Sequence, residues 1–381
     1  MARALALAER ALYLSNPNPR VGCVLTDADG REIGQGHTQQ AGGPHAEVMA
    51  LRDAQARGES TQGATAFVTL EPCSHHGRTP PCCDALAAAG IARVVVATTD
   101  PNPLVAGRGL QRLRDAGVAV ELLPDDHGLA HASRELNIGF FSRMIRQQPW
   151  VRMKVAASLD GTTALHNGTS QWITGGAARA DGHAWRARAC AVLTGVGTVL
   201  EDNPMLDVRL VDTPRQPHLV IVDSHLKTPA NARLFETPAN GLARQIWIYH
   251  ASDEDPAKMA ALRARGATLI PMPGGLRGKV DLSGLLTDLG RREINELHLE
   301  AGHKLNGSFL REGLVDELLL YLAPSLLGPG AGLADITPLE RLDDATALHY
   351  VSADLVGGDL RLRARVNGHD AFLTHPPRPA G

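Results

Sequence analysis

The feature that most constrains this chain is an interrupted set of residues suited to binding a metal. The set begins at His45-Ala46-Glu47, resumes at Glu71-Pro72-Cys73 and closes at Pro80-Pro81-Cys82-Cys83. One imidazole and two thiolates are typical ligands of Zn²⁺, and a site with three protein ligands keeps a fourth position open for water, as catalytic zinc sites do. The chain must therefore bring three distant segments to one ion.

Glu47 follows the histidine by two residues and is not required as a ligand. Zinc lowers the pKa of a coordinated water from 15.7 to about 7, and a carboxylate beside it can carry the proton to a departing amino group. A His-x-Glu step combined with a Pro-Cys step is typical of zinc deaminases. Glu47 is therefore the predicted catalytic residue. His45, Cys73 and either Cys82 or Cys83 are the predicted ligands.

The composition narrows the class of protein. The chain has 381 residues, 44% of them hydrophobic, which allows two or three domains with ordinary cores. It has 38 Lys and Arg against 41 Asp and Glu, so no overall basic surface for nucleic acid is expected. No apolar run approaches the roughly 18 residues of a membrane span. We expect a small-molecule substrate, no nucleic-acid or membrane partner, and a cytoplasmic location.

The first part of the chain alternates helical and strand patterns. An amphipathic helix is predicted around residues 4–12 and strands at 21–25 and 64–70, with His45 starting a further helix. Cys73 then lies just beyond the carboxyl end of a strand, where α/β sheets place their ligands. This pattern predicts an α/β domain over residues 1–147.

The second part repeats the alternation from Trp150 and is predicted to form an α/β domain over residues 148–366. Two glycine-rich turns, at 195–198 and 301–307, follow predicted strands and could receive a pyrophosphate at a helix N-terminus. The first turn lacks the third glycine of the dinucleotide fingerprint, so a standard Rossmann fold is not expected. Residues 367–381 are polar and proline-rich, and we expect them to be disordered.

Several motifs together resemble one family. They resemble the bifunctional riboflavin-biosynthesis deaminase/reductase, in which the two zinc-binding cysteines are also far apart. This resemblance selects Cys82 over Cys83 as the third ligand. The motifs that carry it are His45–Val48, Thr69–Cys83, Asp100–Gly109, Lys154–Gly161, Ser170–Thr174 and Leu299–Gly302.

The resemblance implies a fold and two reactions. The N-terminal domain should be a cytidine-deaminase-like three-layer α/β/α domain with one Zn²⁺. The C-terminal domain should be a dihydrofolate-reductase-like α/β domain that binds NADPH. The first reaction would remove the 2-amino group of 2,5-diamino-6-(5-phosphoribosylamino)pyrimidin-4-one, and the second would reduce the ribosyl group to ribityl. A homo-oligomer joined largely through the reductase half is also implied.

The resemblance also assigns site residues. A guanidinium suits phosphate oxygens, so Arg78 is the expected phosphate contact of the first domain. Lys154 is a candidate general acid in the second domain. Thr38 stands where family members often have a histidine, which puts that substrate contact in doubt. The implied substrate residues are Asn18, Arg78, Ser170, Arg186, Leu206, Arg209 and Glu300. The implied NADPH residues are Ala156, Trp172, Thr198, Asp202, Ser224, Gly302, His303, Lys304, Leu305, Asn306, Gly307 and Ser308.

Three alternatives compete with this interpretation. A nucleic-acid base deaminase shares the zinc motif, but the neutral charge and the 4% aromatic content disfavour it. A nucleobase or nucleotide deaminase could carry a non-catalytic C-terminal domain. A non-catalytic protein could use zinc only to hold its fold together, although such a site has no use for Glu47.

Overall fold

The computed structural model describes residues 1–74, 81–103, 105–252, 255–275 and 278–374. The chain forms two compact units, one of Met1–Gln147 with Ala371–Gly381 and the other of Gln148–Asp370. Both are α/β units, as the alternating sequence pattern predicts. Among the described residues, no helix is both long enough and apolar enough to cross a bilayer.

The first unit is built on a mixed sheet with the strand order β2-β1-β3-β4-β5. Strand β1 is antiparallel to both of its neighbours, whereas β3, β4 and β5 are parallel to one another. The strands are β1 (Gly22–Thr26), β2 (Glu32–His37), β3 (Thr65–Val68), β4 (Arg93–Val96) and β5 (Ala119–Leu122).

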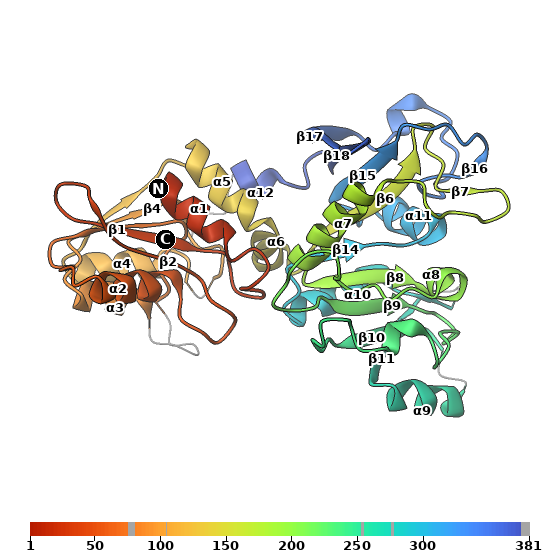
Figure 1. Ribbon diagram of the computed structural model, residues 1–381, viewed down its shortest axis with the longest axis horizontal. Coiled ribbons are helices and arrows are strands. Elements are labelled where there is room, and N and C mark those ends of the chain that lie inside the picture. The colour runs from red at the N-terminus through yellow and green to blue at the C-terminus, as the bar shows by residue number, and fades with distance from the viewer. Residues whose placement is uncertain (75–80, 104, 253–254, 276–277, 375–381) are drawn as a thin grey trace. The chain divides into compact units, whose positions relative to one another are not determined.

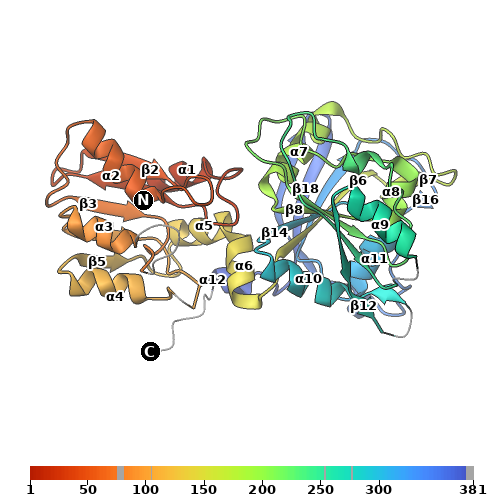
Figure 2. The same ribbon diagram turned by 90° about the horizontal axis from the view of Figure 1, so that it is seen from below.

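Helices cover both faces of this sheet. Helices α2, α3 and α4 lie side by side on one face, and α1 and α5 lie on the other (Figures 1 and 2). The expected three-layer α/β/α arrangement is confirmed. A Cβ at Gly36 would lie 2.4 Å from the carbonyl oxygen of Ala46, so glycine lets α2 sit close to β2. The helices are α1 (Ala2–Glu9), α2 (Ala46–Ala56), α3 (Cys82–Ala88), α4 (Arg108–Asp115), α5 (Gly128–Leu136) and α6 (Ile138–Arg146).

The first unit is completed by a short helix from the other end of the chain, α12 (Ala371–Thr374). Phe372 and Leu373 are buried, and the fully buried Arg134 donates from Nε to the carbonyl oxygen of Leu373 at 2.5 Å. The Arg146 guanidinium lies 5.7 Å from the centre of the Phe372 ring. The expectation of disorder over 367–381 therefore fails for residues up to 374, because two apolar side chains and a buried arginine fix them.

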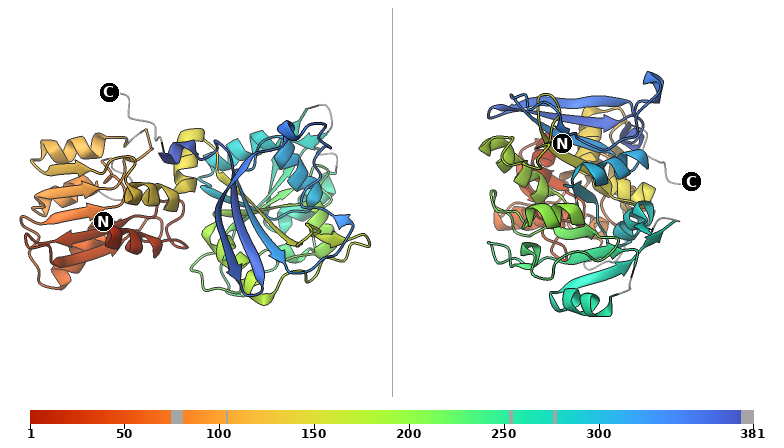
Figure 3. Two further views of the ribbon diagram at one scale, coloured as in Figure 1. Left: turned by 90° about the horizontal axis from the view of Figure 1, so that it is seen from above. Right: turned by 90° about the vertical axis from the view of Figure 1, so that its right-hand side faces the viewer.

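The second unit contains a large sheet with the order β11-β10-β9-β8-β14-β6-β15-β18-β17. Its strands are parallel up to β15, and β18 and β17 then form an antiparallel hairpin at the edge (Figure 3). The strands are β6 (Trp150–Ser158), β8 (Ala191–Gly195), β9 (His218–Val222), β10 (Ile246–His250), β11 (Ala267–Pro271), β14 (Glu296–Leu299), β15 (Glu317–Ala323), β17 (Leu348–Val356) and β18 (Asp359–Val366).

The two faces of the central strands differ in character. One face is apolar and packs against α10 (Leu282–Arg291) and α11 (His303–Arg311), with Met153 and Leu297 among its buried residues. The opposite face meets α7 (Gly176–Arg188). Since successive side chains of a strand alternate between faces, Arg152 points to the α7 side. The other helices include α8 (Val196–Asp202) and α9 (Pro256–Ala264).

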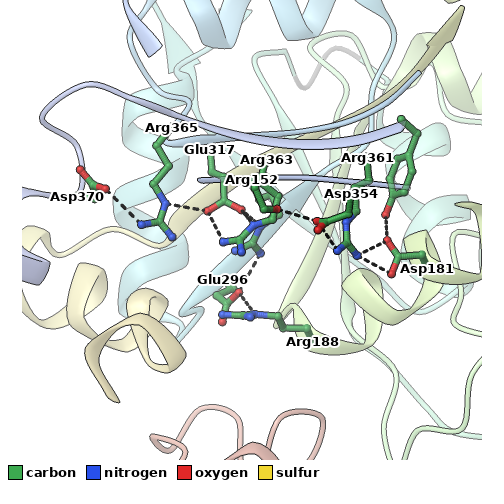
Figure 4. Close-up of polar contacts among 12 residues, drawn as sticks. Arg152, Asp181, Arg188, Glu296, Glu317, Asp354, Arg361, Arg363, Arg365 and Asp370 are labelled. Atoms are coloured by element: carbon green, nitrogen blue, oxygen red, sulfur yellow. Dashed lines mark hydrogen bonds and ion pairs between the residues drawn. The ribbon is translucent and has the colours of Figure 1, made fainter. Parts of the chain in front are cut away.

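A buried ion-pair network lies on this second face (Figure 4). Arg152 bonds Glu296 at 2.9 Å and Glu317 at 2.8 Å, and all three side chains are fully buried. Burial alone would raise the pKa of Glu317, but the charges of Arg152, Arg363 and Arg365 lower it well below its usual range. Each buried charge therefore has a partner, which it needs because an unpaired charge in the interior is very costly.

Candidate active sites

The three predicted zinc ligands meet in the first unit. His45 is the N-cap of α2, Cys73 follows β3, and Cys82 is the first residue of α3. The Nδ1 atom of His45 lies 3.6 Å from Sγ of Cys73 and 3.3 Å from Sγ of Cys82. All three ligand atoms lie within 4.8 Å of one another. Zn–S bonds of about 2.3 Å and Zn–N bonds of about 2.0 Å require ligand separations of this size.

The structure distinguishes the two adjacent cysteines. The thiol of Cys83 donates to the carbonyl oxygen of Cys73 at 2.7 Å, and burial raises the pKa of Cys83 to about 12. It is therefore a neutral thiol that holds the backbone of a ligand. Cys82 completes the cluster instead, in agreement with the choice that resemblance made. Two further histidines between the zinc-binding cysteines, His75 and His76, lie outside the described residues.

The electrostatics of the cluster suit a cation. A hydrogen bond from Cys82 lowers the pKa of Cys73 to about 4, whereas that same bond raises the pKa of Cys82 far above its usual range. The two sulfurs thus share one negative charge, and a divalent cation between them would allow both to ionise. The structure therefore fits zinc at this position.

Glu47 lies beside the cluster in the first turn of α2 and is only 3% exposed. Burial, followed by the negative charge at Cys73, raises the pKa of Glu47 to about 7. A carboxyl group whose pKa is close to neutral pH can both take up and release a proton.

Glu71 has a role that the sequence analysis missed. Its buried carboxylate accepts hydrogen bonds from backbone N–H groups of the loop that opens α4, at 2.9 to 3.3 Å. Glu71 therefore fastens this loop to the segment that carries Cys73. A glutamate before Pro-Cys, together with glycines at a helix start, was the available signal. The donors are Asp100, Gly107, Gly109 and Leu110.

The described part of the first unit includes Asn18 and Thr38, two positions considered for substrate contact. Asn18 is half-buried in the loop after α1, where its backbone N–H donates to Ser15. The hydroxyl of Thr38 accepts the backbone N–H of Val21 at 3.1 Å, so this side chain is engaged in the fold. Arg78 lies outside the described residues.

The second unit contains a cavity of about 1150 Å³ at the carboxyl ends of its parallel strands. The N-terminal ends of α8 and α11 contribute to its wall, and a Cβ built at Gly197 would meet no atom within 4 Å. A dinucleotide phosphate fits such helix N-termini. The predicted NADPH residues that line the cavity are Thr198, Ser224, Gly302, His303, Lys304, Leu305 and Ser308.

Other predicted NADPH residues do not line this cavity. Asn306 is buried and donates to the carbonyl oxygen of Leu333, and a Cβ at Gly307 would lie 2.1 Å from the carbonyl oxygen of Asp335. These two residues pack α11 against the 333–335 segment, because they point to the opposite side of the helix. The remaining residues outside the lining are Ala156, Trp172 and Asp202. Lining residues that the sequence analysis missed include His225, Lys227, Lys279 and Arg311.

Two predicted substrate residues form an ion pair. Arg186 donates hydrogen bonds from Nε and Nη2 to the carboxylate of Glu300, and the Nη2–Oε2 distance is 2.7 Å. Burial would raise the pKa of Glu300, but Arg186 lowers it far below its usual range. Lys154 lies close enough to contribute to this lowering, while burial lowers the pKa of Lys154 itself. Arg186 is therefore paired with Glu300 and is not a free cation.

The segment that carries Leu206 and Arg209 is held by residues that the sequence analysis missed. Arg244 donates to the carbonyl oxygen of Leu206 at 2.7 Å, and Gln216 pairs with both backbone groups of Val208. The Arg209 backbone N–H donates to Nδ1 of His183 at 3.2 Å. The Arg209 guanidinium pairs with Asp207 at 2.6 Å and its side chain stays 44% exposed. Ser170 is half-buried in the loop before α7.

Comparisons with known proteins agree with both sites. Residues 1–98 match the cytidine and deoxycytidylate deaminase zinc-binding region, and residues 149–360 match the RibD C-terminal domain. The riboflavin biosynthesis protein RibD of Escherichia coli is 45% identical over 95% of this chain and 97% of its own length. That of Aquifex aeolicus is 39% identical over 94% of this chain and 96% of its own length.

Solved structures extend the agreement to three dimensions. RibD from Acinetobacter baumannii superposes with a TM-score of 0.83 at 40% identity, covering 96% of this chain and 97% of that one. A diaminohydroxyphosphoribosylaminopyrimidine deaminase/5-amino-6-(5-phosphoribosylamino)uracil reductase from Thermotoga maritima gives a TM-score of 0.82 at 33% identity, with the same coverage. The chain therefore belongs to the RibD family of bifunctional deaminase/reductases of riboflavin biosynthesis.

Proposed function

We propose that the first unit deaminates 2,5-diamino-6-(5-phosphoribosylamino)pyrimidin-4-one and that the second unit reduces the ribosyl group of the product with NADPH. The proposal rests on one observation: the same chain contains both the cluster of His45, Cys73 and Cys82 and a cavity at strand ends that is lined by two helix N-termini. The name of the Thermotoga maritima relative includes both activities.

In the first reaction, His45, Cys73 and Cys82 would hold the zinc ion. Bound there, zinc supplies the Lewis acidity that makes a water molecule nucleophilic near neutral pH. Glu47 moves both protons of the attacking water: one goes to the ring nitrogen beside C2 as the oxygen adds to C2, and the other goes to the amino nitrogen, which leaves as ammonia while C2 becomes a carbonyl. Its pKa of about 7 suits both halves of this transfer.

Glu71 supports this reaction indirectly. Its four hydrogen bonds keep the 100–109 loop beside the Cys73 segment. Asp100 belongs to that loop, and burial raises the pKa of Asp100 to about 7. Asn18 and Arg78 remain proposed substrate contacts, with Arg78 facing the phosphate.

In the second reaction, NADPH supplies the hydride. We assign its phosphates to the cavity wall around Thr198 and Gly302 to Leu305, where the first turns of α8 and α11 present backbone N–H groups. The hydride goes to C1 of the ribosyl group in its open-chain form. The chain's contribution is to orient the two reactants and to exclude water.

The substrate site of the second unit is proposed at the cluster formed by Arg186, Glu300 and Arg209. Glu300 is ionised and only 12% exposed, so it can accept hydrogen bonds from substrate hydroxyl or ring N–H groups. Arg209 is the more exposed cation and is assigned to the phosphate, because Arg186 is taken up by Glu300. Lys154 remains the candidate proton donor.

One experiment tests both halves. Purified protein is given zinc, NADPH and the diaminopyrimidinone ribosyl phosphate, and ammonia release and NADPH oxidation are followed together. We expect ammonia first and an equimolar loss of NADPH afterwards. Ammonia without NADPH oxidation would instead support the alternative of a deaminase with a non-catalytic C-terminal unit. The absence of both would contradict the proposal.

We also propose a homo-oligomer that forms through β17. This edge strand pairs only with β18 among the described residues, and its Tyr350 and Leu355 are 76% and 78% exposed. An apolar edge strand is a ready site for pairing with a second copy of the chain. Leu318 to Leu322 lie inside β15 in the middle of the sheet and do not offer this surface. Light scattering of Leu355→Lys against the native protein tests the proposal, and an unchanged mass would contradict it.

The proposed location is the cytoplasm. All five cysteines are free thiols, and two of them serve as zinc ligands in the proposed site. Thiols of this kind are kept reduced by the cytosolic glutathione and thioredoxin systems. Cell fractionation with an antibody against the native chain tests this proposal.

A further inference from the structure

Strand β14 has an unusually polar face. Glu296 and His298 point toward α7, and Glu300, just beyond the strand, continues the same alternation. Parallel strands covered on both faces are normally apolar on both. Arg152 neutralises Glu296, and Arg186 neutralises Glu300. The histidine between the two carboxylates needs a separate explanation.

His298 is fully buried, and burial lowers its pKa, so the ring is neutral and carries a single N–H. Its Nε2 atom lies 3.1 Å from Oε1 of Glu300. The approach is off the direction of the ring N–H, and neither ring nitrogen has a well-aligned partner among the described residues. Catalytic hydrogen bonds are often poorly aligned until substrate is bound. A buried N–H left without an acceptor costs about 1–3 kcal/mol, and Oε1 of Glu300 lies within reach of the one on His298.

The two oxygen atoms of the Glu300 carboxylate differ in the hydrogen-bond donors that face them. Among the described residues, Oε1 accepts from Nε of Arg186 and also faces His298, whereas Oε2 accepts only from Nη2 of Arg186, at 2.7 Å. Each carboxylate oxygen can accept two hydrogen bonds. The acceptor site left over is therefore on Oε2. The last torsion of a glutamate is soft, so a donor on Oε1 helps Arg186 to fix where Oε2 points.

We propose that His298 is a positioning residue of the reductase reaction, whose Nε2–H holds Oε1 of Glu300 so that Oε2 faces a hydroxyl or ring N–H of the substrate. This inference rests on the proposed reductase function and on the substrate role of Glu300. His298 itself does not touch the reacting atoms, and it acts through the carboxylate.

The test compares two variants of similar volume. His298→Leu removes the N–H, and His298→Gln supplies another N–H of similar reach. With the deaminated intermediate as substrate, we expect KM to rise about tenfold in His298→Leu, which equals about 1.4 kcal/mol, with a smaller change in kcat. In His298→Gln, KM should return to within about twofold of the native value. NADPH affinity and ammonia release by the first unit report in the same samples that the chain is folded.

A double variant sharpens the test. In a Glu300→Gln background, His298→Leu should add no further rise in KM, because both changes remove the same interaction. Additive effects, an equal rise in the Leu and Gln variants, an unchanged KM, or a parallel loss of NADPH affinity would each overturn the proposal. Failure of the native protein to oxidise NADPH with this substrate would instead remove the reductase function itself.

Discussion

The carboxylate of Glu71 accepts a 2.9 Å hydrogen bond from the backbone amide of Gly109, in the first turn of helix α4. A Cβ at Gly109 would lie 2.1 Å from the carbonyl oxygen of Pro72, so the two segments are in direct contact. Asp100 and the start of α4 are thus fixed to the segment that leads into the zinc ligand Cys73.

This contact predicts the effect of Glu71→Gln. The amide NH₂ would face backbone N–H groups that need an acceptor, and leaving such buried groups unpaired costs about 1–3 kcal/mol. Unfolding of the first domain by denaturant can be monitored through the release of zinc. The free energy of unfolding of this domain should be lower by that amount. The matched control is Glu121→Gln, because Glu121 is 49% exposed and pairs on the surface with Arg93. Equal stability of the two variants would contradict the prediction.

The second prediction concerns Glu47→Gln. The amide keeps the volume of the side chain but cannot carry a proton, so ammonia release should fall by about 10²–10⁴-fold. Zinc content, measured by atomic absorption, should stay at one ion per chain. NADPH-dependent reduction of the deaminated intermediate should stay at the native rate, because the second unit contains its own site. Ammonia release at the native rate would remove Glu47 from the mechanism.

The third prediction is a pH dependence. Burial, and then the charges of Arg186 and Arg209, lower the pKa of His183 to about 4 in the folded chain, against about 6.5 in an unfolded chain. Between these values the unfolded chain binds a proton on His183 and the folded chain does not. Stability therefore falls as the pH is lowered from about 6.5 to about 4.

His183→Gln isolates this effect, since a glutamine oxygen can still accept the Arg209 backbone N–H. Unfolding should be measured at several pH values, with NADPH release as the signal for the second domain. The variant should lose less stability than the native chain as the pH falls through this window. Parallel curves for the two proteins would show that His183 makes no such contribution.

The fourth prediction concerns the choice between NADPH and NADH. Lys227 lines the cofactor cavity beside Ser224, and its ammonium makes no ion pair within the described part of the chain. Its charge is therefore available to the additional phosphate of NADPH. Lys227→Ala should weaken NADPH about tenfold, or about 1.4 kcal/mol, and leave NADH unchanged in fluorescence titrations. Lys258→Ala, on α9, is the control. An equal loss of affinity for both cofactors would contradict this assignment.

The fifth prediction tests α12. Truncation after Asp370 removes two buried side chains and the acceptor of the buried Arg134. The Nε–H of Arg134 would lose its acceptor, and a buried donor left unsatisfied costs about 1–3 kcal/mol, so zinc should be released at lower denaturant concentration. Truncation after Thr374 keeps α12 and serves as the control. If both truncated chains release zinc together, the helix does not stabilise the first domain.

Local signals in the sequence were enough for the main architecture. The alternation of strand and helix patterns predicted two α/β parts, and the His-x-Glu and Pro-Cys steps predicted a zinc cluster of His45, Cys73 and either Cys82 or Cys83. The family resemblance selected Cys82, and the structure brings His45, Cys73 and Cys82 together. These signals work because each depends on a few neighbouring residues. The glycine-rich turn at 301–307 was likewise placed correctly at the cavity, although Asn306 and Gly307 face the other side of its helix.

Contacts between distant residues could not be predicted in this way. Arg186 and Glu300 are 114 positions apart, and each alone suggested a free ligand group. Arg134 and Leu373 are 239 positions apart. The polar composition of residues 367–381 gave no indication that helix α12 packs on the first unit. Arg152 lies in a strand that sequence rules expect to be apolar on both faces. In each case the partner decides the role of the residue, and no local pattern identifies the partner.

The docking of α12 also affects how the protein is made. The first domain leaves the ribosome early, yet the carbonyl group that Arg134 requires belongs to Leu373, which is synthesised after the whole second domain. Domains usually finish folding in the order of their synthesis. Here the nascent first domain cannot complete its native contacts until the second domain and the residues of α12 have been translated. The zinc-binding half therefore matures together with the cofactor-binding half, although it is translated first.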